Sequence, residues 1–272
     1  MKPQPGSASP RTATVDTVRD FWQAHINNEY YTDAERASES YFDEIEQRRY
    51  ATHYHLPELF ASMDGTGRSA GPGGRPPQTP PKRLLEVGCG IGVDSIQLAK
   101  RGYAVTAVDL TENALTVARQ FAERRGVGID FRLGNAEGLD FPDQSFDAVY
   151  SFGVLHHTPD IESSVAEVRR VLRPGGTAYV MLYHRDSLVN LVHRALRLPY
   201  ESPTDRKDHC PVVYTFSRGG VRRLFRDFSG VEVRTAYPFT YGFGPLATKT
   251  PLGLRRPLGH AIGWHLMITA RR

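Results

Sequence analysis

The stretch Leu84-Leu-Glu-Val-Gly-Cys-Gly-Ile-Gly-Val93 decides the fold of this chain. It starts as a short apolar run, passes one acid at Glu86, and then opens into glycines at alternate positions. A helical pattern follows and ends at Gly102. A strand, a tight glycine turn and a helix are typical of a nucleotide-binding βα unit, in which glycine lets a ligand lie almost against the backbone. The amides at the start of the helix then point at that ligand.

The spacing of the glycines bears on which ligand is bound. The dinucleotide fingerprint is G-x-G-x-x-G, whereas here the third glycine falls one position early and Val93 follows it. The next strand, Ala104–Asp109, ends in a carboxylate about 20 positions after Gly88, the offset at which an acid meets a ribose diol. We therefore expect Asp109 to accept two hydroxyl hydrogen bonds, and Thr111 to cap the following helix.

Composition limits the class of protein. The chain has 272 residues, of which 40% are apolar and 24% charged, enough to bury the core of one α/β domain with a small cap. It has two cysteines, no run of 18 apolar residues and no signal-peptide pattern, so we expect a cytoplasmic protein without disulfides. His25, His53 and His55 are spaced too irregularly to bind a metal. The net charge of +4 is scattered, and we expect neither a nucleic-acid nor a membrane partner.

The chain divides into three parts. Residues 1–63 predict a disordered tail followed by two or three aromatic-rich helices, which form an N-terminal helical cap. Residues 64–82 contain five glycines and five prolines, a composition that predicts a flexible linker. Residues 83–272 form the core, with an inserted segment at about 186–216 that follows the fifth strand.

Strands alternate with helices in the first part of the core, which predicts a mostly parallel, doubly wound α/β sheet. This alternation stops after Tyr183. We expect a helix from Ser217 to Phe228, a strand at Val231–Ala236 and a last strand at Ile262–Ala270. Because Pro238–His260 is rich in glycine and proline, we expect no helix there and an antiparallel last strand.

Three further motifs follow the glycine turn in the order and spacing of one known family. They are Gly134-Asn-Ala-Glu-Gly-Leu-Asp-Phe-Pro-Asp-Gln-Ser-Phe-Asp147, Ser151-Phe-Gly-Val-Leu-His-His157 and Val171-Leu-Arg-Pro-Gly-Gly176. Together with the glycine turn, they resemble the small-molecule branch of the class I S-adenosylmethionine (SAM)-dependent methyltransferases over about residues 83–183. The resemblance implies a Rossmann-like seven-stranded sheet, SAM as the cofactor and a small molecule as the methyl acceptor.

The resemblance also implies which residues contact SAM. Gly88, Cys89 and Gly90 would pass their backbone along the sugar and methionine portions. Asn135 stands where the family commonly has an Asp that contacts the adenine amino group, and its carbonyl oxygen can accept the same hydrogen bond. The other expected cofactor residues are Glu86 beneath the turn, Asp109 at the ribose, Leu110 over the adenine, Ala136 beside Asn135, and Ser151, through its backbone, at the methionine end.

The methyl group of SAM is already activated, so the protein must hold the acceptor in line and, where the acceptor is protonated, remove a proton. His156 and His157 follow the fourth strand at the end of the sheet where ligands bind, and imidazole suits a base near neutral pH. The resemblance favours His156, with His157 second. Tyr30 and Tyr31 resemble an aromatic lid, and Tyr183 ends the fifth strand over the same crevice, so we expect these tyrosines to contact the acceptor.

Other classes of protein fit the sequence less well. The glycine spacing disfavours a nicotinamide dehydrogenase, and Ser151-Phe-Gly-Val stands where a nucleic-acid methyltransferase would carry a Pro-Pro or Pro-Cys motif. A quinone- or isoprenoid-type C-methyltransferase and a non-catalytic SAM-binding module stay open, as does a homo-oligomer. The sequence does not distinguish O-, N- and C-methylation. We therefore expect methyl transfer to an O, C or N acceptor in secondary or specialised metabolism.

Overall fold

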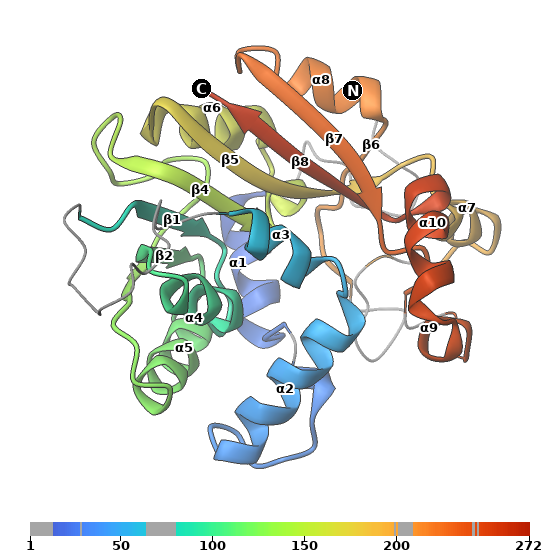
Figure 1. Cartoon of the computed structure of the whole chain (residues 1–272), viewed down its shortest axis with the longest axis horizontal. Helices are drawn as coiled ribbons and strands as arrows, with labels where there is room; N and C mark the ends of the chain where they lie inside the picture. The colour runs from blue at the N-terminus through green and yellow to red at the C-terminus, as the bar shows by residue number, and fades with distance from the viewer. Residues whose placement is uncertain are drawn as a thin grey trace, which may run out of the picture.

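The computed structural model describes residues 13–27, 29–63, 80–198, 200, 209–240, 243 and 245–272. Residues 1–12 of the expected tail, 64–79 of the expected linker and 201–208 of the expected insertion lie outside these ranges. Of Tyr30, only the backbone is described. Within the described ranges, helices and strands interleave along the chain (Figure 1). The α/β class expected from the sequence is confirmed.

One mixed sheet runs through the protein. Its strands are β1 (Arg83–Val87), β2 (Ala104–Asp109), β3 (Asp130–Leu133), β4 (Phe146–Phe152), β5 (Leu172–His184), β6 (Thr215–Phe216), β7 (Gly230–Ala236) and β8 (His265–Arg271). Their order is β3-β2-β1-β4-β5-β8-β7, and the first five pair in parallel. Strand β8 is antiparallel to β5 and β7, as expected. The sheet has eight strands rather than seven, because the short β6 pairs with β5.

Helices cover both faces of the sheet. On one face, α6 (Ile161–Val171) and α8 (Arg218–Leu224) bury Val168 and Val221 against it. On the other face, α4 (Val93–Lys100) and α5 (Glu112–Arg124) contribute Leu98 and Leu115 to a second apolar cluster. Each α-helix thus buries an apolar stripe at helical spacing, which is what the sequence pattern predicts. Helix α8 ends earlier than the expected Phe228.

In the described residues before β1, three α-helices and one short helical turn are present. They are α1 (Val15–Ala24), η1 (Glu29–Tyr31), α2 (Glu39–Thr52) and α3 (Leu56–Ser62). Thr14 begins α1 with a capping box in which its hydroxyl oxygen accepts from the Thr17 amide. The ring of Phe42 on α2 stacks on that of Phe121 on α5, with 4.2 Å between centroids. The helices of the expected cap therefore pack directly on the core.

The segments after β5 differ from the prediction. Helix α7 (Leu188–Ala195) follows β5, and α9 (Pro245–Lys249) and α10 (Leu252–Ile262) lie between β7 and β8. The prediction that this segment lacks a helix is wrong. Gly259 serves packing there, because a Cβ on it would lie 2.7 Å from the Tyr54 hydroxyl and 3.3 Å from the Ala236 Cα. None of the described helices is long and apolar enough to cross a bilayer.

Candidate functional site

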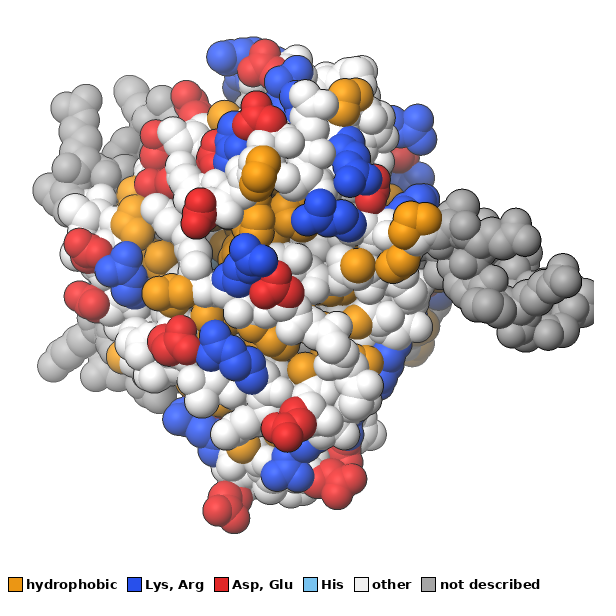
Figure 2. Space-filling view, turned by 90° about the vertical axis from the view of Figure 1, so that its left-hand side faces the viewer, with side chains coloured by type: hydrophobic (Ala, Val, Ile, Leu, Met, Phe, Trp, Pro, Cys, Tyr) orange, Lys and Arg blue, Asp and Glu red, His pale blue; other side chains and the backbone are white. Residues whose placement is uncertain are grey.

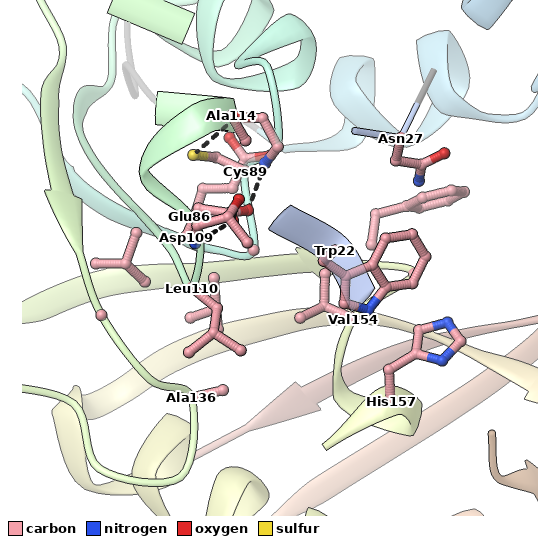
Figure 3. Close-up of a pocket in the computed structure, with 18 of the residues that line it drawn as sticks. Trp22, Asn27, Glu86, Cys89, Asp109, Leu110, Ala114, Ala136, Val154 and His157 are labelled. Atoms are coloured by element: carbon pink, nitrogen blue, oxygen red, sulfur yellow. Dashed lines mark hydrogen bonds between the residues drawn. The ribbon is translucent and has the colours of Figure 1, made fainter. Parts of the chain in front are cut away.

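A cavity opens where the carboxyl ends of β1, β2 and β4 meet α1 (Figure 3). The glycine turn and Asp109 line one part of it. Side chains from α1, together with the residues after β4, line the other part, where Figure 3 shows Trp22 beside His157. The carboxyl end of a parallel sheet is the usual position of a ligand in this architecture.

The glycine turn is shaped for close approach of a ligand. Gly88, Gly90 and Gly92 have φ values of 76°, 53° and 77°, a region that favours glycine. A Cβ on Gly88 would lie 2.2 Å from a methyl carbon of Val154, so this position also requires glycine for space. A Cβ on Gly90 would have no atom within 4 Å. The backbone of Gly90 therefore faces open space, and the turn fits a ligand that lies against it.

Asp109 is held at the end of β2 by three hydrogen bonds. One carboxylate oxygen accepts from the Gly90 amide at 2.8 Å, and the other accepts from the amide and hydroxyl of Thr111 at 3.0 and 2.8 Å. Burial raises the pKa of this carboxyl, and the bonds from Gly90 and Thr111 oppose that shift. Thr111 makes no side-chain capping bond, and its hydroxyl donates to Asp109. The expected cap of α5 is thus a positioning contact for the acid.

A buried charge network lies at the other side of the turn. Asp94, in the first turn of α4, accepts from Arg49 Nε at 2.8 Å and, through its second oxygen, from Arg49 Nη2. The hydroxyls of Tyr50 and Tyr150 also donate to Asp94, at 2.9 and 2.7 Å. The nearby Glu86 accepts from the Ser95 hydroxyl. Burial, and next the charge of Asp94, raises the pKa of Glu86 well above its ordinary value.

No motif in the sequence indicates Arg49 or Asp94, although both line the cavity. Their pairing joins positions 45 residues apart, on α2 and α4, so no local pattern indicates it. Of the described residues that line the cavity, Arg49 is the one lysine or arginine. It therefore supplies the positive charge beside Glu86 and Asp94.

The second part of the cavity is mainly apolar. Its walls are formed by Val18 and Trp22 of α1, by Phe152 at the end of β4, and by Val154 just after that strand. The ring centroids of Trp22 and His157 are 5.4 Å apart. Nδ1 of His157 lies 2.8 Å from the Val212 carbonyl oxygen, and because a carbonyl can only accept, this nitrogen carries the proton. The ring of His157 is thereby oriented at the cavity wall.

Most of the expected cofactor residues come together. The predicted residues that line the cavity are Glu86, Gly88, Cys89, Gly90, Asp109, Leu110, Asn135, Ala136 and His157. The side-chain oxygen of Asn135 accepts from the Glu137 amide at 3.1 Å, which forms a local turn. Ser151 is buried within β4 and does not line the cavity; its hydroxyl donates to the Val87 carbonyl at 2.9 Å.

The structure separates the two adjacent histidines. His156 is fully buried and does not line the cavity. Its ring packs 3.9 Å from that of Tyr183, and burial lowers its pKa well below the ordinary value. Tyr183 belongs to a buried aromatic cluster beside the cavity, and Tyr31 to the core under α2. The side chain of Tyr30 lies outside the described residues.

Three more histidines are buried where the cap meets the sheet. The rings of His53 and His265 stack with centroids 5.6 Å apart, and His265 Nδ1 lies 3.3 Å from His55 Nε2. Burial lowers the pKa of all three, that of His55 to about 3. In the unfolded chain each ring binds a proton near pH 6.5, whereas the folded protein does so only at lower pH. Stability should therefore fall as the pH drops below about 6.5.

In the variant His265→Phe, the free energy of unfolding should decrease less steeply as the pH drops below about 6.5. One buried neutral histidine contributes about 1.4 kcal/mol per pH unit to the slope between about pH 6 and pH 5. Urea unfolding at several pH values measures this slope of the unfolding free energy against pH. His260→Phe is the control, because His260 is exposed. An equal slope in both variants would show that His265 takes up its proton equally in the folded and unfolded states.

The fold and the cavity together define a class of protein. A parallel sheet with an antiparallel strand β8 between β5 and β7, a glycine turn facing a cavity, and an acid ending β2 are features of class I SAM-dependent methyltransferases. Residues 85–180 match the family described as "Methyltransferase domain". The segment around the glycine turn therefore belongs to a methyltransferase domain family, and class I SAM-dependent methyltransferases use SAM as their cofactor.

Curated relatives resemble the segment around the glycine turn. The ubiquinone biosynthesis O-methyltransferase of Paramagnetospirillum magneticum is 42% identical over 93 residues, which cover 34% of this chain and 37% of that protein. The sterol 24-C-methyltransferase of Gibberella zeae is 35% identical over 131 residues, covering 45% of this chain and 34% of that protein. The matched segments thus span less than half the length of these relatives.

Solved structures resemble most of the chain. The (4+2)-cyclase SpnF has a TM-score of 0.60 at 18% identity and covers 96% of this chain and 97% of that one. An S-adenosylmethionine-dependent methyltransferase from Mesorhizobium loti has a TM-score of 0.55 at 21% identity, with 80% and 97% covered. At these identities, the likeness concerns the fold alone.

Proposed function

We propose that the protein transfers a methyl group from SAM to an uncharged small molecule that carries a hydroxyl group or an acidic carbon. One observation carries this proposal: a single cavity joins the glycine turn and Asp109 to an apolar end that contains an imidazole. Bound SAM would supply an activated methyl group. The named relatives act in ubiquinone biosynthesis and on sterols, and this supports an acceptor with a largely apolar surface.

The part of the cavity around the glycine turn suits SAM. Asp109 would bind the ribose, while Leu110 and Ala136 offer an apolar surface to the adenine. The methionine portion ends in an ammonium and a carboxylate. Glu86 would face the ammonium, and Arg49, with its positive charge at the cavity, would face the carboxylate.

Asp109→Ala should weaken SAM binding about 30- to 150-fold, since two hydrogen bonds lost from buried groups cost about 2–3 kcal/mol. The change also removes the acceptor of the Gly90 amide, which holds the turn. Isothermal titration with SAM measures the effect. Glu112→Ala is the control, because its carboxylate pairs with Arg119 at the exposed start of α5. Unchanged SAM affinity in Asp109→Ala would remove Asp109 from the cofactor site.

The acceptor would lie at the end walled by Trp22 and Phe152. Because Val18, Trp22 and His25 come from α1 and the residue that follows it, the cap would help to select the acceptor. We propose His157, which lines the cavity, as the base in place of His156, which does not. Both cysteines are buried thiols that form no disulfide with the described residues, which supports a reducing compartment such as the cytoplasm.

The direct test is methyl transfer by the full-length protein. SAM labelled in its methyl group would be incubated with phenols, amines, carboxylates and prenylated phenols, and both the labelled product and S-adenosylhomocysteine would be measured. We expect turnover with phenolic acceptors. Transfer restricted to amines would contradict the hydroxyl proposal. SAM binding without transfer to any acceptor in the panel would favour a non-catalytic SAM-binding module.

A further inference from the structure

Exposed leucines gather at one end of the protein. Six large hydrophobic side chains are exposed among the described residues, and five of them belong to α7, α9, α10 or the residue directly after α7. These three helices lie at the right-hand end of the molecule in Figure 1. We call the five side chains the leucine surface: Leu191, Leu196, Leu246, Leu252 and Leu254. A concentration of this kind on a folded protein marks a surface that binds something.

Helix α7 directs an apolar side outward. Val189 and Asn190 are buried, while Leu191, Ala195 and Leu196 are exposed. Leu191 and Leu196 are 64% and 65% exposed. A helix that only packs on its own core would place polar residues at these outward positions. The outward side of α7 therefore suits an apolar or interfacial environment.

The charge around the leucine surface is mostly positive, although Glu58 pairs with Arg256 of α10 and Asp186 pairs with Arg185 just before α7. Neither residues 187–200 nor residues 233–272 contain an aspartate or a glutamate, although the chain has 30 acidic residues. Arg194, Arg197 and Lys249 are exposed and form no ion pair with the described residues. By contrast, the face of the molecule in Figure 2, on the left-hand side of Figure 1, carries acidic and basic side chains interspersed. The leucine surface thus combines apolar anchors with unbalanced positive charge.

A continuous series of rings connects α7 to the cavity. From the cavity wall, Trp22 contacts His157, and the ring of His157 lies 5.8 Å from that of Tyr183. Tyr183 stacks on Trp264 at 4.3 Å. The series then passes from Trp264 to Tyr200 at 5.9 Å, and from Tyr200 to His193 on α7 at 4.9 Å. This series of rings therefore links the cavity wall to α7, the helix that carries part of the leucine surface.

We propose that the leucine surface docks the protein on an anionic lipid bilayer. Leucines would enter the interface, while the arginines and the lysine bind lipid phosphates, a combination typical of peripheral membrane binding. Charge complementarity identifies the occupant, because an apolar partner alone would not require the unpaired positive charges of Arg194, Arg197 and Lys249 beside the leucines. Docking of this kind would bring the cavity close to acceptors dissolved in the bilayer. The docking step itself does not depend on methyl transfer.

Vesicle flotation of the full-length protein tests this proposal. We expect the protein to float with vesicles of phosphatidylglycerol and phosphatidylcholine. The fraction that floats should be at least tenfold smaller with vesicles of phosphatidylcholine alone. It should fall as much at about 0.5 M salt, because salt screens the attraction between the basic residues and the lipid phosphates. In the variant Leu191→Gln/Leu196→Gln, the fraction bound to the anionic vesicles should fall at least fivefold. In Arg194→Glu/Arg197→Glu, it should fall at least tenfold. SAM affinity should not change in either variant, which shows that they are folded.

Two matched controls come from the opposite part of the molecule. Leu133 on β3 is 59% exposed, and Arg124 on α5 is exposed, so Leu133→Gln and Arg124→Glu change similar groups elsewhere. Both should float as the unmodified protein does. The proposal is overturned if the unmodified protein does not bind anionic vesicles, or if the controls lose as much binding as the α7 variants. It is also overturned if the α7 variants float normally but convert a dimer to a monomer in light scattering, since the surface would then bind a second copy of the chain.

Discussion

Replacing Arg49 with Met should lower the free energy of unfolding by about 3–5 kcal/mol, because it leaves a buried carboxylate without its cation. Asp94 would keep the two tyrosine hydroxyls as donors but lose both bonds from the guanidinium. The same change should weaken SAM binding at least tenfold if Arg49 faces the cofactor carboxylate. Urea unfolding and isothermal titration measure the two effects separately.

Helix α2 offers a matched control for this variant. Arg48 is exposed and directly precedes Arg49, so Arg48→Met removes the same charge without touching Asp94. It should change stability by less than about 0.5 kcal/mol. Adding Asp94→Asn to Arg49→Met should cost much less than the sum of the single changes, since the two residues are in contact. Additive effects would contradict a stabilising pair between the cap and the core.

His157→Ala should lower the turnover number about a hundredfold or more while SAM affinity stays within about twofold, as expected when a general base is removed. The side chain lines the acceptor end of the cavity, and its ring is oriented by the Val212 carbonyl. The dependence of turnover on pH gives an independent readout. The variant should lose the limb of the profile that reports deprotonation of the base.

His156 supplies the comparison. Because this ring is buried behind His157, His156→Phe should keep most of the turnover per folded molecule, with any loss appearing as reduced stability. Near-normal turnover in His157→Ala on the true acceptor would mean that no base is needed there, or that His156 takes the role expected from the sequence. Loss of turnover in His156→Phe together with normal turnover in His157→Ala would support the second explanation.

The cofactor half of the site could be predicted from the sequence because its determinants are local. The glycine turn needs glycine at Gly88 for both its φ and the space beside Val154, and such a need appears in the sequence as an exact spacing. Asp109 ends a strand of β-branched and small residues, so its position at the edge of the sheet follows from the strand itself. Alternating strands and helices then restrict the sheet to a few arrangements.

Other features depended on contacts between distant parts of the chain. Helix α10 formed in a segment rich in glycine and proline, because Gly259 lets it approach Ala236 and tertiary packing outweighs intrinsic propensity. The sequence shows His156 and His157 as equivalent neighbours. Only the turn after β4, together with Trp22 from α1, decides which ring meets the cavity.

The sequence by itself determined the βα glycine turn and the acid that ends the next strand, because each requires particular residues at fixed local spacing. It did not determine which cation lines the cavity beside them. Arg49 lies on an ordinary charged helix, and its role arises only where α2 packs against α4 and the guanidinium meets Asp94. The energy of a buried ion pair depends on the distance between its two charges, and the tertiary structure sets that distance.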